Sequence, residues 1–243
     1  MRSIFIKDFR LFFSGLTGFL SIGLFLLLMG LFLFIFPETS IFDYGYATLD
    51  KFFELAPWVM LLLVPAVTMR SFSDEFRTGT WEILRTRPLK LWQIVGGKYL
   101  AALGVAFFTL LPTLLYVFTI KWLSINGSID SGAIAGAYIG LLLLTALFVA
   151  IGIFCSALTT NPVVGFLLAA FACFVLYTGF ESVSSIPLFS GGADYWIQML
   201  GIQSNYQNIS RGVIELRVLI YFIGLSLVFL TATKQWLHKK QAI

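Results

Sequence analysis

Long apolar runs alternate with short polar segments along the whole chain. A helix needs roughly 20 apolar residues to cross about 30 Å of hydrocarbon, and six runs approach that length. They cover about residues 17–36, 52–69, 98–120, 133–157, 163–180 and 218–233. Continuous runs of this kind exclude barrel strands, and a bilayer admits only helices and closed barrels. The pattern predicts an all-α membrane protein with six transmembrane helices.

Composition supports the same class. Of 243 residues, 59% are hydrophobic and 12% are charged, and the mean hydropathy is +0.92. Each polar segment is too short for a nucleotide-binding or catalytic domain of about 100 residues. Residues 1–243 are therefore predicted to form one polytopic domain, whose energy source is a partner or a site within the bilayer.

Basic residues are distributed unevenly among the polar segments. Twelve of the 16 Lys and Arg residues lie before the first run, between the second and third runs, or after the last run. The opposite side has only Lys51, Lys121, Arg211 and Arg217. The positive-inside rule then predicts that both termini and the second loop are cytoplasmic. Topology thus accounts for the basic pI, and nucleic-acid binding is not predicted.

The segment before the first run has helical amphipathicity. Ser3, Lys7, Arg10 and Ser14 fall on one stripe, with phenylalanines mostly away from it. This pattern predicts an N-terminal interfacial helix resting on the lipid bilayer. The alternative is a simple cytoplasmic extension of the first span.

The apolar runs lack the side chains that intramembrane chemistry needs. Their central portions contain no ionisable residue, and Glu54 and Lys98 are expected to reach the interface from span ends. Ion-coupled transport is disfavoured, although sodium sites made of carbonyls and hydroxyls stay open. Since no histidine lies in a span, Ser156 is expected to cap or pack a helix, and intramembrane hydrolysis is disfavoured.

Cofactor and metal chemistry find no support either. Cys155 and Cys173 lie in apolar runs and are expected to be small core residues. His238 has no partners for a metal site. Gly96-Gly97-Lys98 is not a P-loop, because the earlier glycine is missing and Tyr99 follows. The chain is predicted to be non-catalytic, with no cofactor and no metal.

A stripe of small residues marks the fourth run. Gly132, Gly136 and Gly140 recur every four residues. Small residues let two helices approach closely, so the stripe predicts a packing surface. The pattern leaves open whether this surface packs against another helix of the same chain or against a second copy of the chain.

The segment between the second and third runs is charged and amphipathic. Ser71–Asp74 fits a capping box, and Phe72 and Phe76 share a helical face. Gly79 is expected to break this helix, and a second short helix is expected from Thr80 until Pro88 ends it. The alternative reading is an ordinary interfacial loop that holds anionic lipid heads.

This string resembles the cytoplasmic loop of ABC type 2 transporter permeases. The matching positions are Glu75, Arg77, Gly79, Thr80, Glu82, Ile83, Leu84, Pro88, Gly97 and Lys98. The early Phe-rich segment through Gly18 and residues 210–217 look like the permease subunit of the gliding-motility ABC transporters of Bacteroidota. The resemblance implies an inner-membrane exporter subunit of a bacterium.

In that family a separate ABC ATPase docks on the loop, which acts as a coupling helix. Carried onto this chain, the docking positions are Asp74, Glu75, Phe76, Arg77, Gly79, Thr80, Trp81, Glu82 and Leu84. Trp81 departs from the family pattern, which has an aliphatic residue there, and this leaves the docking face open.

The resemblance also implies a pathway and a second membrane subunit. The second span would line the pathway, with Pro65 as a means of bending it. A second permease copy or a related membrane subunit would complete the enclosure. The segment between Glu181 and Leu216 would include a short amphipathic element on the outer side.

Two other functions fit the same pattern. An autonomous channel or carrier would need no ATPase. A membrane scaffold for a motility or secretion apparatus would need a docked partner but would move no solute.

Overall fold

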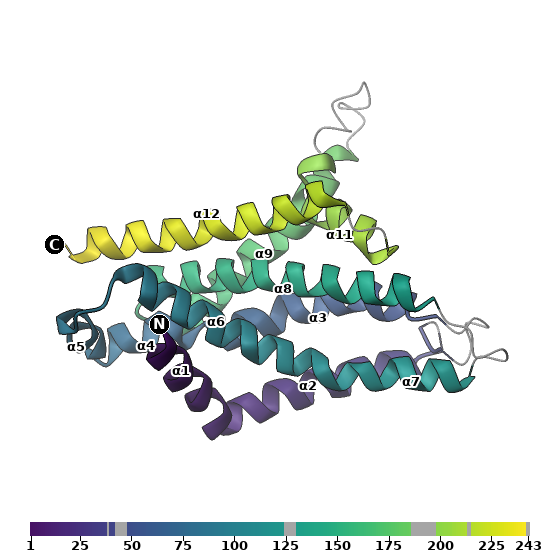
Figure 1. Cartoon of the computed structure of the whole chain (residues 1–243), viewed down its shortest axis with the longest axis horizontal. Coiled ribbons are helices and arrows are strands. Elements are labelled where there is room, and N and C mark those ends of the chain that lie inside the picture. Colours follow the sequence, from purple (N-terminus) through teal and green to yellow (C-terminus); the bar gives the residue numbers. More distant parts are fainter. Residues whose placement is uncertain (38, 42–47, 124–129, 186–197, 213–214, 242–243) are drawn as a thin grey trace.

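The computed structural model describes residues 1–37, 39–41, 48–123, 130–185, 198–212 and 215–241. All the regular elements in these ranges are helices, most of them in one elongated bundle (Figure 1). Their bounds are α1 Arg2–Ser14, α2 Leu16–Phe34, α3 Asp50–Thr68, α4 Arg70–Arg77, α5 Thr80–Thr86, α6 Leu91–Leu110, η1 Leu111–Thr113, α7 Leu114–Leu123, α8 Ser131–Leu158, α9 Pro162–Ser184, α11 Ile202–Ser210 and α12 Leu216–Gln241.

Within the described residues, five helical stretches are long and apolar enough to cross a membrane. They are Asp50–Arg77, Leu91–Trp122, Ser131–Leu158, Pro162–Ser184 and Leu216–Lys240. The pair α1 and α2 makes a sixth candidate if it counts as one span, with a 67° bend between its halves. The expected all-α membrane fold is confirmed.

The two ends of the bundle differ. Helices α1, α4 and α5 and the C-terminal end of α12 lie toward one end (Figure 1). Helix α7 and the N-terminal ends of α3 and α8 lie toward the other. Every segment with a predicted excess of basic residues is therefore at the same end.

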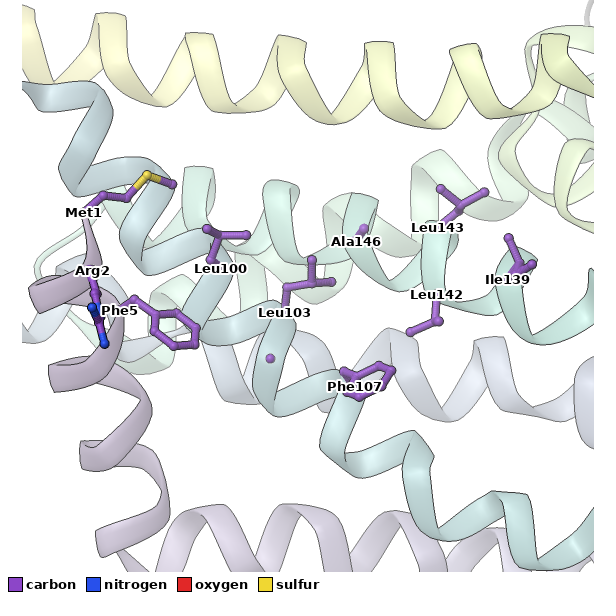
Figure 2. Close-up of a pocket in the computed structure, with 11 residues that line it drawn as sticks. Met1, Arg2, Phe5, Leu100, Leu103, Phe107, Ile139, Leu142, Leu143 and Ala146 are labelled. Atoms are coloured by element: carbon purple, nitrogen blue, oxygen red, sulfur yellow. The ribbon is translucent and has the colours of Figure 1, made fainter. Parts of the chain in front are cut away.

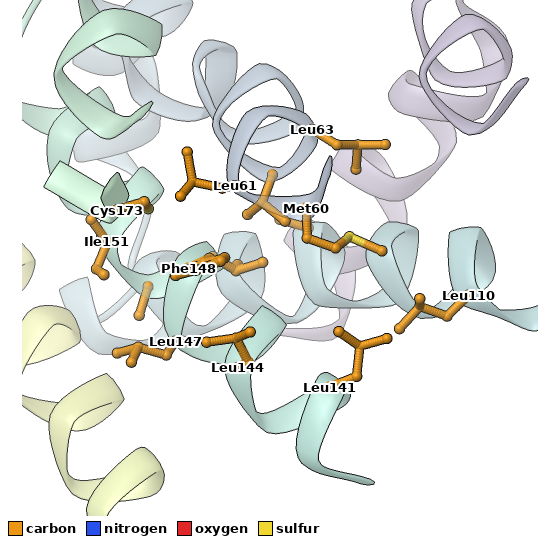
Figure 3. Close-up of a cluster of buried hydrophobic side chains, with 14 of the residues drawn as sticks. Met60, Leu61, Leu63, Leu110, Leu141, Leu144, Leu147, Phe148, Ile151 and Cys173 are labelled. Atoms are coloured by element: carbon orange, nitrogen blue, oxygen red, sulfur yellow. The ribbon is translucent and has the colours of Figure 1, made fainter. Parts of the chain in front are cut away.

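Helix α8 is the centre of the packing. It lies against α3, α6, α9, α11 and α12, and Figure 3 shows its Leu144, Leu147 and Phe148 among side chains of neighbouring helices. Membrane helices associate through close packing rather than exclusion from water, so small residues matter. At Gly152, a Cβ would lie only 2.1 Å from Thr68 Oγ1 of α3. This closest approach requires glycine.

The predicted glycine stripe faces another part of the same chain. A Cβ at Gly140 would lie 2.8 Å from Ile209 Cγ2, and one at Gly136 would lie 3.0 Å from Gly212 Cα. Gly132 is different, because its nearest neighbour is the Asp130 carboxylate that caps its own helix. The close surface is thus an intrachain contact between α8 and the α11 segment.

Helix α11 also holds α3 through one buried hydrogen bond. The Tyr206 hydroxyl donates to the Phe53 carbonyl oxygen over 2.7 Å. That carbonyl lacks its helical donor, because residue 57 is proline and has no N–H. Burial raises the pKa of Tyr206 well above its usual value, which keeps the hydroxyl protonated and able to donate. Part of the segment expected to be amphipathic, residues 186–197, lies outside the described residues.

Several sequence expectations need correction. Helix α6 begins at Leu91, seven residues before the expected span, and α12 continues to Gln241, because helices run past the apolar zone into polar sequence. The expected capping box at Ser71–Asp74 is wrong, since α4 begins at Arg70 with no side-chain cap. Cys155 and Cys173 are free and buried, as expected.

Candidate functional site

Helices α4 and α5, with the turn between them, form an elbow over residues 70–86. Only Met69 separates α4 from α3, and its backbone is also helical. Ser156 of α8 holds this junction: its hydroxyl accepts from the Phe72 N–H over 3.0 Å and donates to the Met69 carbonyl over 2.9 Å. The elbow is therefore a direct continuation of α3, fixed to α8.

Gly79 makes the turn of the elbow. Its φ of +72° lies in the left-handed region, which glycine enters at little cost and which ends many helices. The Thr78 hydroxyl donates to the Asp74 carbonyl over 2.8 Å and closes the end of α4. Helix α5 then ends at Thr86, two residues before Pro88. The expected break and second helix are confirmed.

An aromatic cluster joins α5 to α4. The Trp81 ring packs edge-on against Phe76 and Phe72, with centroids 5.5 and 5.9 Å apart. On the other side, Lys240 Nζ of α12 lies 3.5 Å from the Phe76 ring centroid. Trp81 is only 7% exposed. Trp81 stands where the family pattern has an aliphatic residue. Because its side chain faces inward, this difference affects a contact within the elbow and not the elbow's exposed surface.

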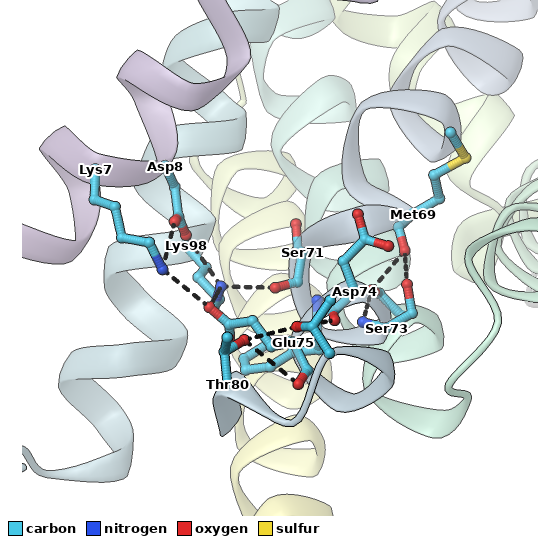
Figure 4. A network of polar contacts seen from close by, with 12 residues as sticks. Lys7, Asp8, Met69, Ser71, Ser73, Asp74, Glu75, Thr80 and Lys98 are labelled. Carbon is cyan, nitrogen blue, oxygen red and sulfur yellow. Dashed lines mark hydrogen bonds and ion pairs between the residues drawn. The ribbon is translucent and has the colours of Figure 1, made fainter. Parts of the chain in front are cut away.

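A group of charges centred on the buried Lys98 ties the elbow to α1 and α6 (Figure 4). Lys98 Nζ lies 2.8 Å from Glu75 Oε1, 3.1 Å from Asp8 Oδ2 and 2.6 Å from the Ser71 carbonyl. These three acceptors use all three ammonium donors. Lys7 adds a longer ion pair to Glu75 at 3.4 Å. We call Lys7, Asp8, Glu75 and Lys98 the charge cluster.

The burial of Lys98 corrects a sequence expectation. Its side chain is 2% exposed, so it does not reach the interface as a span-end residue would. It instead lies between the elbow and α1, where the two carboxylates offset the cost of burying its charge. Glu54, the other expected span-end residue, does reach outward and pairs with Lys51 over 2.9 Å.

The expected docking residues divide into two groups. Exposed positions form an outward surface, whereas others face the bundle. Outward lie Arg77, Gly79, Thr80 and Glu82, inward lie Glu75 and Trp81, and half-buried are Asp74, Phe76 and Leu84. Asp74 is engaged within its own helix, since Arg77 lies 3.2 Å away.

Three residues outside the expected docking set belong to this site. Ile83 is 62% exposed beside Glu82. The sequence could have identified it, because it is one of the positions that match the loop motif of ABC type 2 permeases. Lys98 also matches that motif, but its buried ion pair with Asp8 of α1 could not be inferred from the motif. Ser156 offered no signal, because its partners are backbone groups from a segment more than 80 residues away.

The remaining expected positions lie within the bundle. Pro65 is buried in the last turn of α3, four residues before the junction at Met69. A cavity of about 520 Å³ lies between α1, α2 and the elbow, bounded by Arg70 and Lys98 at its polar side. Among the described residues, no cluster of three potential metal ligands occurs.

Comparison with known proteins identifies the family of this chain. A search of curated proteins found no match. The family model described as "ABC-2 family transporter protein" matches residues 37–233, well over half of the chain, and leaves out α1 and α2. Members of this family are membrane components that work with an ABC ATPase subunit. The chain therefore belongs to the ABC-2 transporter family and is a multi-pass membrane permease subunit of an ABC transporter.

Proposed function

We propose that the outward surface of the elbow binds the ATPase and that the inward contacts of the elbow carry its movement into the bundle. The single observation that supports this is the division of the elbow into two faces. Arg77, Glu82 and Ile83 are exposed, whereas Glu75 and Trp81 are buried in contacts that hold the elbow together and to the bundle.

The inward contacts give a route for that movement. The elbow continues α3 directly, meets α8 through Ser156, reaches α6 and α1 through Lys98, and meets α12 through Lys240. A packed interior transmits displacement rather than absorbing it. The cavity beside Arg70 leaves space for the elbow to shift toward α1 and α2.

The elbow lies in the cytoplasm in this proposal. The uneven distribution of Lys and Arg supports a cytoplasmic elbow. The basic N-terminal helix and the basic C-terminal end of α12 lie at the same end of the bundle as the elbow. Helix α1, which packs on α6, would then rest at the inner interface of a bacterial inner membrane.

The pathway would run along α3 between two permeases. Support comes from an outward apolar surface on neighbouring helices: Leu62 of α3 is 57% exposed and Phe171 of α9 is 67% exposed. A second copy, or a related subunit, would cover such a surface, and Pro65 would allow the end of α3 to bend. Export linked to gliding motility rests on the sequence resemblance, and loss of gliding in a deletion strain tests it.

Charge reversal at Glu82 tests the docking proposal. Glu82→Arg is expected to weaken association with the ATPase by about tenfold or more, because like charges across an interface cost several kcal/mol. Ile83→Asp is expected to act similarly, since burying an aliphatic side chain contributes about 1.5–3 kcal/mol. The measurement is co-purification with a tagged ABC ATPase encoded beside this gene, at matched membrane levels.

The matched control is Glu54→Arg, an exposed carboxylate at the other end of α3, which should leave association unchanged. Glu75 is a poor test, because reversing it would disrupt the charge cluster first. Undiminished association of both Glu82→Arg and Ile83→Asp would refute the docking surface. Solute flux through the permease reconstituted alone would favour a channel or carrier.

A further inference from the structure

An apolar groove lies between α1, α6 and α8 on the outside of the bundle. Its volume is about 840 Å³. Figure 2 shows its lining, in which α1 contributes Phe5 and Arg2, while α6 and α8 contribute aliphatic and aromatic side chains. The main lining residues are Leu100, Leu103, Phe107, Leu142 and Ala146.

Among the described residues that line the groove, Arg2 has the only charged side chain. Among the described residues, no carboxylate lies within ion-pair distance of its guanidinium, whereas Lys7 on the same helix is paired. The groove thus combines one unpaired cation with a hydrocarbon-like wall.

The depth of the groove can be read from the charge cluster. Lys7, the exposed member of the charge cluster, marks a polar level beside Lys98, and Leu100 follows Lys98 by half a turn. From Leu100 to Phe107, α6 rises about 10 Å at 1.5 Å per residue. One leaflet contributes about 15 Å of hydrocarbon, so the groove runs from near the polar level toward the middle of the bilayer.

We propose that this groove binds an anionic phospholipid of the leaflet on the elbow's side. The phosphate pairs with the Arg2 guanidinium, whose planar donors suit two phosphate oxygens. An acyl chain lies along α6 and α8. The charge complementarity favours a lipid over a second copy of the chain, because among the described residues that line the groove Arg2 offers a cation for an anion and no other side chain can form hydrogen bonds with a polypeptide.

Such a lipid would hold α1 against α6. That contact also contains the charge cluster, in which Asp8 of α1 meets Lys98 of α6. Occupancy of the groove therefore stabilises the inward anchor of the elbow without touching the elbow's outer surface.

Native mass spectrometry of the purified chain tests the lipid site. Phosphatidylglycerol and phosphatidylcholine with identical acyl chains are added at equal concentration. The wild type is expected to retain phosphatidylglycerol about fivefold better, since one arginine near the surface contributes about 1 kcal/mol toward anionic lipid. Arg2→Gln should abolish that preference.

Two further variants make the test specific. Arg10→Gln, an exposed arginine on the same helix outside the groove, should keep the preference. Leu100→Trp, an exposed position that would fill the groove, should lower retention of both lipids while the chain stays monodisperse. Equal retention of the two lipids by the wild type overturns the proposal. So does an equal loss in Arg10→Gln, or a dimer that Leu100→Trp dissociates.

Discussion

Lys98→Met is expected to destabilise the folded chain by about 3–5 kcal/mol, the largest effect of any single substitution considered for this chain. The ammonium group satisfies Glu75, Asp8 and the Ser71 carbonyl at once. Without it, two largely buried carboxylates keep only the longer contacts to Lys7, at 3.4 and 3.8 Å. Thermal unfolding of the purified protein in detergent micelles, followed by intrinsic tryptophan fluorescence, measures the loss.

The double variant Lys98→Met/Glu75→Met separates charge imbalance from packing. Removing both members of a buried pair costs less than removing one, so the double variant should be more stable than Lys98→Met. Lys90→Met, at an exposed position one turn before Ile94, should stay within about 0.5 kcal/mol of the wild type. A wild-type melting temperature for Lys98→Met would show that the charge cluster does not hold the elbow.

Tyr206→Phe is expected to cost about 1–3 kcal/mol, because it leaves the buried Phe53 carbonyl without a donor. The hydroxyl is needed there only because Pro57 has no N–H. In a Pro57→Ala background the helix supplies its own donor, and the same Tyr206→Phe change should then cost little. The two free energies, measured by thermal unfolding, form a double-mutant cycle.

The cycle makes a prediction that a general packing role for Tyr206 does not. If Tyr206→Phe destabilises the wild-type chain and the Pro57→Ala variant equally, the hydroxyl does not serve the orphaned carbonyl. Tyr116→Phe is a suitable control, since the Tyr116 hydroxyl has no hydrogen-bond partner among the described residues. It should change stability only slightly.

The sequence predicted the fold class because each span must satisfy its own backbone in hydrocarbon. Helix ends were less predictable. The start of α6 at Leu91 lies in polar sequence, where hydropathy carries no signal. The Ser71–Asp74 box failed for another reason: α4 follows α3 with one intervening residue, and the Phe72 and Ser73 N–H groups find their acceptor in the Ser156 hydroxyl of α8.

At the candidate site, the sequence identified the segment but not the directions of its side chains. Gly79 was predictable from local chemistry, since a left-handed turn favours glycine. Glu75 was predicted to be a docking residue, but it is buried and pairs with Lys98 of α6 and Lys7 of α1, which are two other helices. The inward position of Trp81 likewise depends on its packing against Phe72 and Phe76 of α4. Tertiary pairing of this kind leaves no mark within a single segment.

The most direct test of the proposal that the elbow binds the ATPase is photocrosslinking from the tip of the elbow. A benzophenone amino acid replaces Ile83, and in a second protein it replaces Trp122, which is 89% exposed at the opposite end of the bundle. Each is irradiated in membranes that contain the co-expressed ATPase. The proposal predicts an ATPase adduct from position 83 and none from position 122. An adduct from position 122 alone, or no adduct from position 83, would contradict it.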